Sequence, residues 1–267
     1  MPDATLPAPG LGTYENTDPE TCRASVRIAL DCGYRHVDTA ELYENEAAVG
    51  AGLDAADVDR EEVFVATKLD SRNLGYDAVR DHALGCCDRL GVDTLDLLYV
   101  HWPIRTYDPE GTLAAFDELH DEGLVRHVGL SNFTPDLLAD ALDRLDAPLF
   151  AHQVECHPLL PQEELRATAR EDDHYLVAYS PLAKGEVLDV PELVDVAAKH
   201  DATPAQVSLA WLDGKENVVP IPKAATPAHI RENYAALDLE LDDEDVRRID
   251  AIERRKRVVD FDAAPWN

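Results

Sequence analysis

Short apolar segments rich in β-branched residues alternate with amphipathic segments along almost the whole chain of 267 residues. The apolar segments have the length of strands, whereas the segments between them repeat apolar residues at helical spacing, as Leu113, Phe116 and Leu119 do. Strands that alternate with helices predict βα units and a parallel sheet. The eight predicted strands cover residues 11–13, 34–38, 63–68, 95–100, 126–130, 151–155, 176–179 and 218–221.

The number of βα units favours a closed barrel over a doubly wound open sheet, and a chain of this length suits one barrel. A doubly wound sheet that binds a dinucleotide would carry a Gly-x-Gly-x-x-Gly turn directly after a strand. Gly10 and Gly12 begin that pattern, but Glu15 stands at the third position and no strand precedes it. We therefore predict an α/β fold with a single (β/α)8 TIM barrel over residues 1–267.

Threonine followed by proline marks the start of three predicted helices, at Thr134-Pro135, Thr203-Pro204 and Thr226-Pro227. A threonine side chain can accept a hydrogen bond from a free backbone N–H group of the first turn. Proline suits the first helical position because the N–H group that it lacks would have no partner there. We therefore predict helices that begin at these positions.

The composition is strongly acidic: 54 Asp and Glu residues oppose 24 Lys and Arg residues, which gives a formal net charge of −30. The negative electrostatic field of such a chain repels nucleic acid and anionic membranes, so we expect neither as a partner. The acids are spread among 45% hydrophobic residues, which argues against disorder. Because molar salt shortens the Debye length to about 3 Å and screens this repulsion, we expect a halophilic protein.

The chain has no stretch of about 18 apolar residues, and its N-terminus lacks the basic and apolar regions of a secretory signal. Five cysteines without a CxxC motif are typical of reduced thiols. We therefore expect a cytoplasmic protein, and we expect it to be a monomer. The segment HQVECH at residues 152–157 resembles a metal cluster, but neighbouring strand residues point to opposite faces. We expect no metal, and hence no metal-dependent hydrolase.

Polar residues follow every predicted strand. In a barrel the carboxyl ends of the strands meet at one face, where catalytic groups lie. Taken singly, Asp38 could cap a helix, Tyr43 could be a packed aromatic residue, Lys68 a surface charge and His101 a core histidine. Chance would seldom place Asp, Lys and His at three exits with a tyrosine one short loop away, so we predict a functional site. The exit residues are Thr13, Asp38, Lys68, His101, Ser131, Asn132, Gln153, Tyr179, Ser180 and Lys223.

At these exits the chain resembles the aldo-keto reductases. The matching motifs run in order from about residue 10 to residue 235: GLGTY, GYRHVDTAELYENEAAVG, VFVATKL, LDLLYVHWP, HVGLSNF, HQVECHPLL, AYSPLAKG and VVPIPKAATPAHIRENY. The short segment after AYSPLAKG is similar to the prokaryotic branch that includes the 2,5-diketo-D-gluconate reductases. The resemblance implies a (β/α)8 barrel that holds NADPH across its mouth and acts on a small-molecule carbonyl substrate.

The resemblance also implies a catalytic tetrad of Asp38, Tyr43, Lys68 and His101. A nicotinamide cofactor would supply the hydride that no side chain can supply. Negative charge then develops on the carbonyl oxygen, and a proton donor, here Tyr43, lowers the barrier. We expect the Lys68 ammonium to lower the pKa of Tyr43, and Asp38 to keep Lys68 in place and charged. His101 would donate a hydrogen bond that orients the substrate carbonyl.

The cofactor contacts follow from the same resemblance. Ser131, Asn132 and Gln153 would bind the carboxamide of the nicotinamide, and Tyr179 would stack on its ring. The expected set is Gly12, Thr13, Tyr14, Asp38, Ser131, Asn132, Gln153, Tyr179, Ser180, Pro181, Leu182, Lys223, Ala224, Thr226, His229, Glu232 and Asn233.

Two departures from the family pattern concern the 2′-phosphate of NADPH. The family usually has serine where this chain has Ala224, and often arginine where it has His229. A neutral imidazole binds a phosphate more weakly than a guanidinium does. We therefore expect only a modest preference for NADPH, with dual use of NADPH and NADH.

Tyr14 and Trp102 are expected to form an aromatic wall of the substrate pocket beside the tetrad, with Phe133 or Trp266 as a further candidate. Such a wall suits many aldehydes, ketones and keto-sugars and identifies none of them. We therefore predict an NAD(P)H-dependent oxidoreductase. The alternative is a regulatory barrel that binds the nicotinamide cofactor as a redox sensor and has little turnover.

We predict that the free energy of unfolding falls as salt is removed, because the repulsion among the excess carboxylates is then no longer screened. Denaturant titrations at molar and at millimolar NaCl measure this change. A non-ionic osmolyte at matched osmolality controls for effects other than screening. A chain that is equally stable and active without added salt would contradict the halophilic interpretation.

Overall fold

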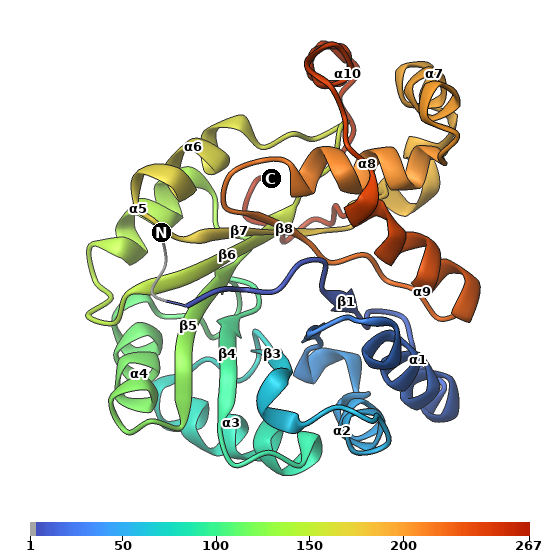
Figure 1. Cartoon of the computed structure of the whole chain (residues 1–267). Coiled ribbons are helices and arrows are strands. Elements are labelled where there is room, and N and C mark those ends of the chain that lie inside the picture. Colours follow the sequence, from blue (N-terminus) through green and yellow to red (C-terminus); the bar gives the residue numbers. More distant parts are fainter. Residues whose placement is uncertain (1–3) are drawn as a thin grey trace.

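Eight parallel strands close into a barrel in the computed structural model, which describes residues 4–267 (Figure 1). They pair in sequence order, and the N–H groups of Gly10 and Gly12 donate to the carbonyls of Pro220 and Pro222 at 3.0 and 3.1 Å, which joins the first strand to the last. The predicted (β/α)8 barrel is confirmed. The strands are β1 Leu11–Gly12, β2 His36–Asp38, β3 Phe64–Leu69, β4 Leu95–Val100, β5 Val125–Ser131, β6 Leu149–Glu155, β7 Tyr175–Tyr179 and β8 Val218–Pro220.

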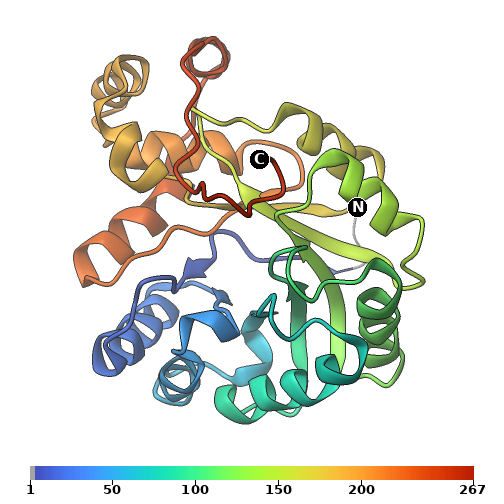
Figure 2. The same cartoon turned by 180° about the vertical axis from the view of Figure 1, so that it is seen from behind.

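Helices surround the strands (Figure 1, Figure 2). The side chains of Thr134, Thr203 and Thr226 each accept a hydrogen bond from a first-turn N–H, which confirms the three predicted helix starts. The predicted alternation of one strand with one helix does not hold after β7, because two helices and a 3₁₀ segment lie between β7 and β8. The helices are α1 Pro19–Cys32, α2 Glu46–Asp54, α3 Tyr76–Leu90, α4 Pro109–Asp121, α5 Pro135–Leu142, α6 Glu163–Glu171, α7 Pro191–His200, α8 Pro204–Asp213, α9 Pro227–Tyr234 and α10 Asp243–Asp250, with 3₁₀ segments η1 Glu41–Tyr43, η2 Arg60–Glu62, η3 Ala183–Asp189 and η4 Ala235–Asp238.

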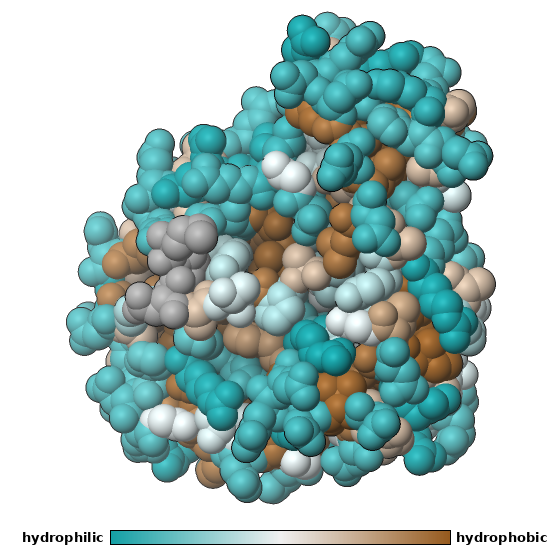
Figure 3. Space-filling model, in the orientation of Figure 1, coloured by the Kyte–Doolittle hydropathy of each residue, from teal (hydrophilic) through white to brown (hydrophobic). Residues whose placement is uncertain are grey.

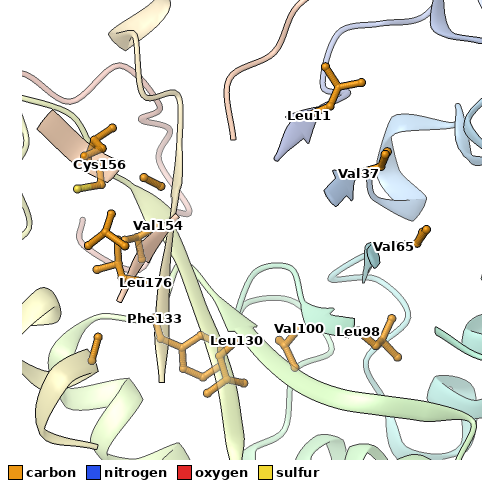
Figure 4. Packing of buried hydrophobic residues seen from close by; sticks show 14 of the residues in the cluster. Leu11, Val37, Val65, Leu98, Val100, Leu130, Phe133, Val154, Cys156 and Leu176 are labelled. Carbon is orange, nitrogen blue, oxygen red and sulfur yellow. The ribbon is translucent and has the colours of Figure 1, made fainter. Parts of the chain in front are cut away.

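The strands separate two apolar layers because their side chains alternate in direction. On β4, Leu97 and Tyr99 belong to the cluster inside the barrel, whereas Leu98 and Val100 pack in the larger cluster beneath the helices. Figure 4 shows part of this outer cluster. A Cβ atom at Gly129 would lie 2.4 Å from the Tyr99 ring, so only glycine leaves room for that ring on the neighbouring strand.

Hydrophilic residues cover most of the face seen in Figure 3. The acid-rich helix α10 exposes Asp243 and Glu244 to solvent while it buries Ile249. Within residues 4–267 no helix combines the length and the apolar character needed to cross a bilayer. Across the same residues, His, Cys, Asp and Glu side chains form no group of three or more that could hold a metal ion.

His174, between α6 and β7, is a fully buried histidine whose ring nitrogens have no hydrogen-bond partner among the described residues. Burial lowers the pKa of His174 from 6.5 to about 4, although the nearby Asp172 and Asp173 oppose this shift. Between these pH values the unfolded chain binds a proton at His174 that the folded chain does not bind. The free energy of unfolding therefore falls as the pH is lowered through this window.

We predict that His174→Leu reduces this acid-dependent loss by up to about 1.4 kcal/mol per pH unit, the limit for one proton. Denaturant titrations at constant salt between neutral pH and pH 4 measure the slope. His229 is exposed on α9, so His229→Gln is the matched control and should leave the slope unchanged. Equal slopes for His174→Leu and the wild type would contradict the prediction.

Candidate active site

A cavity of about 560 Å³ opens at the carboxyl ends of the strands. Every strand contributes to it through its last residues or through the loop that follows, as expected for a barrel of this kind. Most of the predicted site residues therefore share one space. Those that line the cavity are Gly12, Thr13, Tyr14, Asp38, Tyr43, His101, Trp102, Ser131, Asn132, Gln153, Tyr179, Ser180 and Lys223.

A buried ion pair lies beside the cavity. The side chains of Lys68 on β3 and Asp38 on β2 are only 1% and 3% exposed, and Lys68 Nζ lies 2.5 Å from Asp38 Oδ1. Lys68 Nζ also donates to the Thr39 carbonyl at 2.6 Å, and Gln153 Nε2 donates to Asp38 Oδ2 at 2.8 Å. Burial lowers the pKa of Lys68, and the Asp38 carboxylate opposes that shift. The hydrogen bonds thus fix the orientation of both the Lys68 ammonium and the Asp38 carboxylate.

Tyr43 lies at the end of η1, in the loop after β2, and faces this ion pair. The Lys68 Nζ atom is 5.3 Å from the centroid of the Tyr43 ring, and the His101 and Tyr43 ring centroids are 5.7 Å apart. Desolvation raises the pKa of Tyr43 well above its usual value, and the negative charge of Asp38 adds to this shift. The net shift of the Tyr43 pKa is therefore upward, opposite to the lowered pKa that we expected, because desolvation and the charge of Asp38 dominate. The phenol keeps its proton at neutral pH.

His101 follows β4 and is 5% exposed. Burial lowers the pKa of His101 to about 3, and the positive charge of Lys68 contributes. The imidazole is therefore neutral near pH 7 and carries one N–H group that can donate a hydrogen bond. Asn132 Nδ2 donates to the backbone carbonyl of His101 at 2.9 Å, which fixes this loop against β5.

Uncharged polar side chains form the neighbouring part of the cavity. Ser131, Asn132 and Gln153 are nearly fully buried, and Tyr179 donates its hydroxyl hydrogen to Asn132 Oδ1 at 2.8 Å. Asn132 Nδ2 also donates to Ser131 Oγ at 3.0 Å, with the Asn132 backbone in the left-handed region at φ 65°. Amide and hydroxyl groups can both donate to and accept from a carboxamide, and Tyr179 adds an aromatic ring. This set fits a nicotinamide group.

Cations without acidic partners also face the cavity. Arg105, Lys184 and Lys223 line it, and within residues 4–267 none of them forms an ion pair. The two acids that line the cavity, Asp38 and Asp70, are each paired with a base, Lys68 and Arg72 respectively. In a chain with a net charge of −30, this excess of positive charge is local to the cavity. It suits the phosphates of a dinucleotide.

Some predicted residues do not line this cavity. Thr226 caps α9, and Glu232 Oε1 accepts a hydrogen bond from Thr203 Oγ1 at 2.8 Å. Phe133 was a candidate for the substrate wall, but it is 2% exposed and packs in the outer core against Tyr107, so that interpretation is wrong. The predicted cofactor residues outside the cavity lining are Pro181, Leu182, Ala224, Thr226, His229, Glu232 and Asn233. Their cofactor roles stay predictions.

The cavity also contains residues that the sequence interpretation missed. Asp70, Ser71 and Arg72 follow β3, and Ile104 and Arg105 follow β4, so an inspection of longer loops after each strand would have found them. No periodic pattern pointed to the C-terminal residues. The missed lining residues are Leu42, Asp70, Ser71, Arg72, Ile104, Arg105, Lys184, Ile221, Val259 and Phe261.

Comparison with known proteins agrees with this geometry. Residues 9–254 match the model of the Aldo/keto reductase family. An aldo-keto reductase of Mycolicibacterium smegmatis is 39% identical over 259 residues, which cover 95% of this chain and 92% of the relative. The glyoxal reductase of Bacillus subtilis is 37% identical over 253 residues, which cover 95% and 91%. The crystal structure of a protein described as a 2,5-diketo-D-gluconic acid reductase B superposes with a TM-score of 0.92 at 34% identity, over 97% of this chain and 92% of the other.

The family match, together with the barrel and the polar groups at its mouth, identifies an oxidoreductase that uses a nicotinamide cofactor. The chain belongs to the aldo/keto reductase family and is an NAD(P)H-dependent enzyme.

We predict that Asp38→Asn destabilises the fold by about 3–5 kcal/mol at neutral pH, because it leaves the Lys68 ammonium buried without its counter-charge. The pKa of Lys68 should fall further in the variant, so its deficit in unfolding free energy should shrink as the pH rises through that pKa. Denaturant titrations between pH 6 and pH 10 measure this. The double variant Asp38→Asn with Lys68→Met should recover most of the stability. A single variant as stable as the wild type would contradict the prediction.

Proposed function

We propose that this enzyme transfers a hydride from NAD(P)H to the carbonyl of small aldehydes, ketones or keto-sugars, with Tyr43 as the proton donor. One observation carries the proposal: four side chains from three neighbouring strands and the loops after them meet beside one cavity, namely Asp38, Tyr43, Lys68 and His101. A redox-sensing barrel with little turnover would have no need for this arrangement of a phenol, an ammonium and a neutral imidazole.

The nicotinamide cofactor supplies the hydride when it is bound. Tyr43 holds its proton at neutral pH and donates it to the oxygen that gains negative charge, since an alkoxide is more basic than a phenolate. The Lys68 ammonium lies near the Tyr43 ring and stabilises the phenolate that this donation leaves. Asp38 keeps the ammonium in place, and the neutral His101 donates a hydrogen bond to the carbonyl oxygen.

The cofactor is held in this proposal by residues from β5 to α9. Ser131, Asn132 and Gln153 bind the carboxamide, and Tyr179 stacks on the nicotinamide ring. Residues 180–182 follow the pyrophosphate. Lys223, Ala224, Thr226, His229, Glu232 and Asn233 lie at the adenosine end. Lys223 forms no ion pair with the described residues, so its charge can bind a phosphate, whereas Ala224 and His229 offer less than serine and arginine would. We propose a preference for NADPH over NADH of less than about 1,000-fold in kcat/KM, which corresponds to about 4 kcal/mol.

The relatives' printed names support small carbonyl substrates, since one is a glyoxal reductase and another is described as a 2,5-diketo-D-gluconic acid reductase B. The proposal is tested by a panel of aldehydes, ketones and keto-sugars at high salt, with loss of NADPH and of NADH absorbance followed separately. Turnover of at least one carbonyl is the expected result. Cofactor binding without turnover across the panel would favour the redox-sensing alternative.

We predict that Tyr43→Phe lowers kcat by at least about 1,000-fold, or about 4 kcal/mol, because the proton donor is lost while the ring remains. NADPH should still bind, as measured by quenching of protein fluorescence. Tyr14→Phe is the matched control, because Tyr14 lines the same cavity with its ring 5.2 Å from that of Tyr43. Its kcat should fall less than about tenfold. If carbonyl reduction by Tyr43→Phe stays within that range too, Tyr43 is not the proton donor.

A further inference from the structure

The C-terminal segment, residues 256–267, forms a strap across the mouth of the barrel. It contains no helix or strand and crosses the face shown in Figure 2. Val259 and Phe261 of this strap line the cavity. The rings of Phe261 and Trp266 lie 4.9 and 5.6 Å from the ring of Trp102, measured between centroids. The strap therefore supplies the wall that faces Trp102.

Glu155, the last residue of β6, binds the backbone of the strap. Its side chain is fully buried, and its two carboxylate oxygens accept the backbone N–H groups of Val258 at 2.6 Å and Val259 at 2.8 Å. The buried His157 lies beside it, with Nε2 3.0 Å from Glu155 Oε1. Among residues 4–267 no lysine or arginine pairs with Glu155. A buried carboxylate is costly unless its oxygens are hydrogen-bonded, so these two strap N–H groups are its main compensation.

Among residues 4–267, two further polar contacts join the strap to the rest of the chain, both through Lys256. Lys256 donates its backbone N–H to the Leu159 carbonyl at 2.9 Å, and its ammonium forms an exposed ion pair with Glu186 at 2.6 Å. Exposed pairs of this kind contribute little. Asp260 accepts the Trp266 indole N–H at 3.0 Å, which folds the strap onto itself and not onto the barrel. Glu155 is thus the side chain that fixes the strap backbone to the sheet.

We propose that Glu155 is a positioning residue that holds the strap over the cavity and thereby makes the enzyme select substrates by the fit of their apolar part between Trp102 and Phe261. This inference rests on the proposed carbonyl reduction. Glu155 is absent from the cavity lining, so it acts through Val258 and Val259 and not by touching the substrate. When the strap is loosened, a bulky aromatic aldehyde loses its wall, whereas a small aldehyde that reaches only the tetrad does not.

Glu155→Gln tests this role, because an amide keeps the size of the side chain but has one acceptor oxygen in place of two. Its NH₂ group would face one of the strap N–H groups. We expect KM for 4-nitrobenzaldehyde to rise at least fivefold, on the order of 1 kcal/mol. With methylglyoxal, kcat and KM should stay within about twofold of the wild-type values, well under 1 kcal/mol. Glu186→Gln is the matched control, because it also removes a carboxylate that contacts the strap but leaves the backbone bonds intact.

A second measurement needs no turnover. The sequence RRKR at residues 254–257 immediately precedes Val258, and its first three residues are exposed. Release of the C-terminal peptide by trypsin, followed by mass spectrometry, should be at least several-fold faster in Glu155→Gln than in the wild type and in Glu186→Gln. If the wild type reduces no carbonyl, the proposed function fails, and this measurement still decides whether Glu155 anchors the strap.

Val258→Pro serves as a second variant where Glu155→Gln does not fold, because proline removes the N–H that donates to Glu155 Oε1 and leaves the carboxylate in place. Trypsin does not cut the bond between Arg257 and the introduced proline, so the cleavage of this variant is compared after residues 254–256 only. It should show the same faster cleavage at these bonds and the same rise in KM for the aromatic aldehyde alone. Unchanged cleavage in these variants overturns the anchor. An unchanged ratio of the two KM values overturns the role in selectivity, even where cleavage is faster.

Discussion

The site depends on one buried charge, the ammonium of Lys68. An ammonium on the inside of a strand near the barrel mouth is stable only when acceptors surround it, and Asp38 and the Thr39 carbonyl on the neighbouring segment provide them. This requirement fixes β2 against β3 and sets where the loop that carries Tyr43 begins. Gln153 then bonds the second oxygen of Asp38 from across the barrel. The Asp38 carboxylate and the Gln153 amide are thus oriented around this one charge, and the Tyr43 phenol lies beside it.

Charge is distributed unevenly between the surface and the cavity. The chain carries a net charge of −30, yet the acids that line the cavity are each paired with a base, while Arg105, Lys184 and Lys223 face it without an acidic partner in the described part of the chain. The acidic surface and the basic cavity therefore meet two different requirements. The surface interacts with water and salt, whereas the cavity must accept an anionic dinucleotide.

Most of the barrel and much of the site were predictable because they depend on local rules. Short β-branched segments end at polar residues, and parallel topology brings those ends together, so Asp38, His101 and Gln153 could be assigned before any coordinates were known. The rule failed for Phe133, since the residue after a strand exit can turn into the core. The sequence also could not predict the direction of the Tyr43 pKa shift. Desolvation and the charge of Asp38 outweigh the nearby Lys68, and that balance depends on distances in three dimensions.

By itself, the sequence determined the order of the βα units, the identities of the exit residues and the acidic composition, since each is a property of neighbouring residues or of a count. The tertiary structure decided which residues beyond the exits face the cavity. Val259 and Phe261 come from a C-terminal segment without periodicity, and they reach the cavity because Glu155, about 100 residues earlier in the chain, binds the strap backbone. Contacts of that kind depend on the closed barrel, because only closure brings the end of β6 and the C-terminus to the same face.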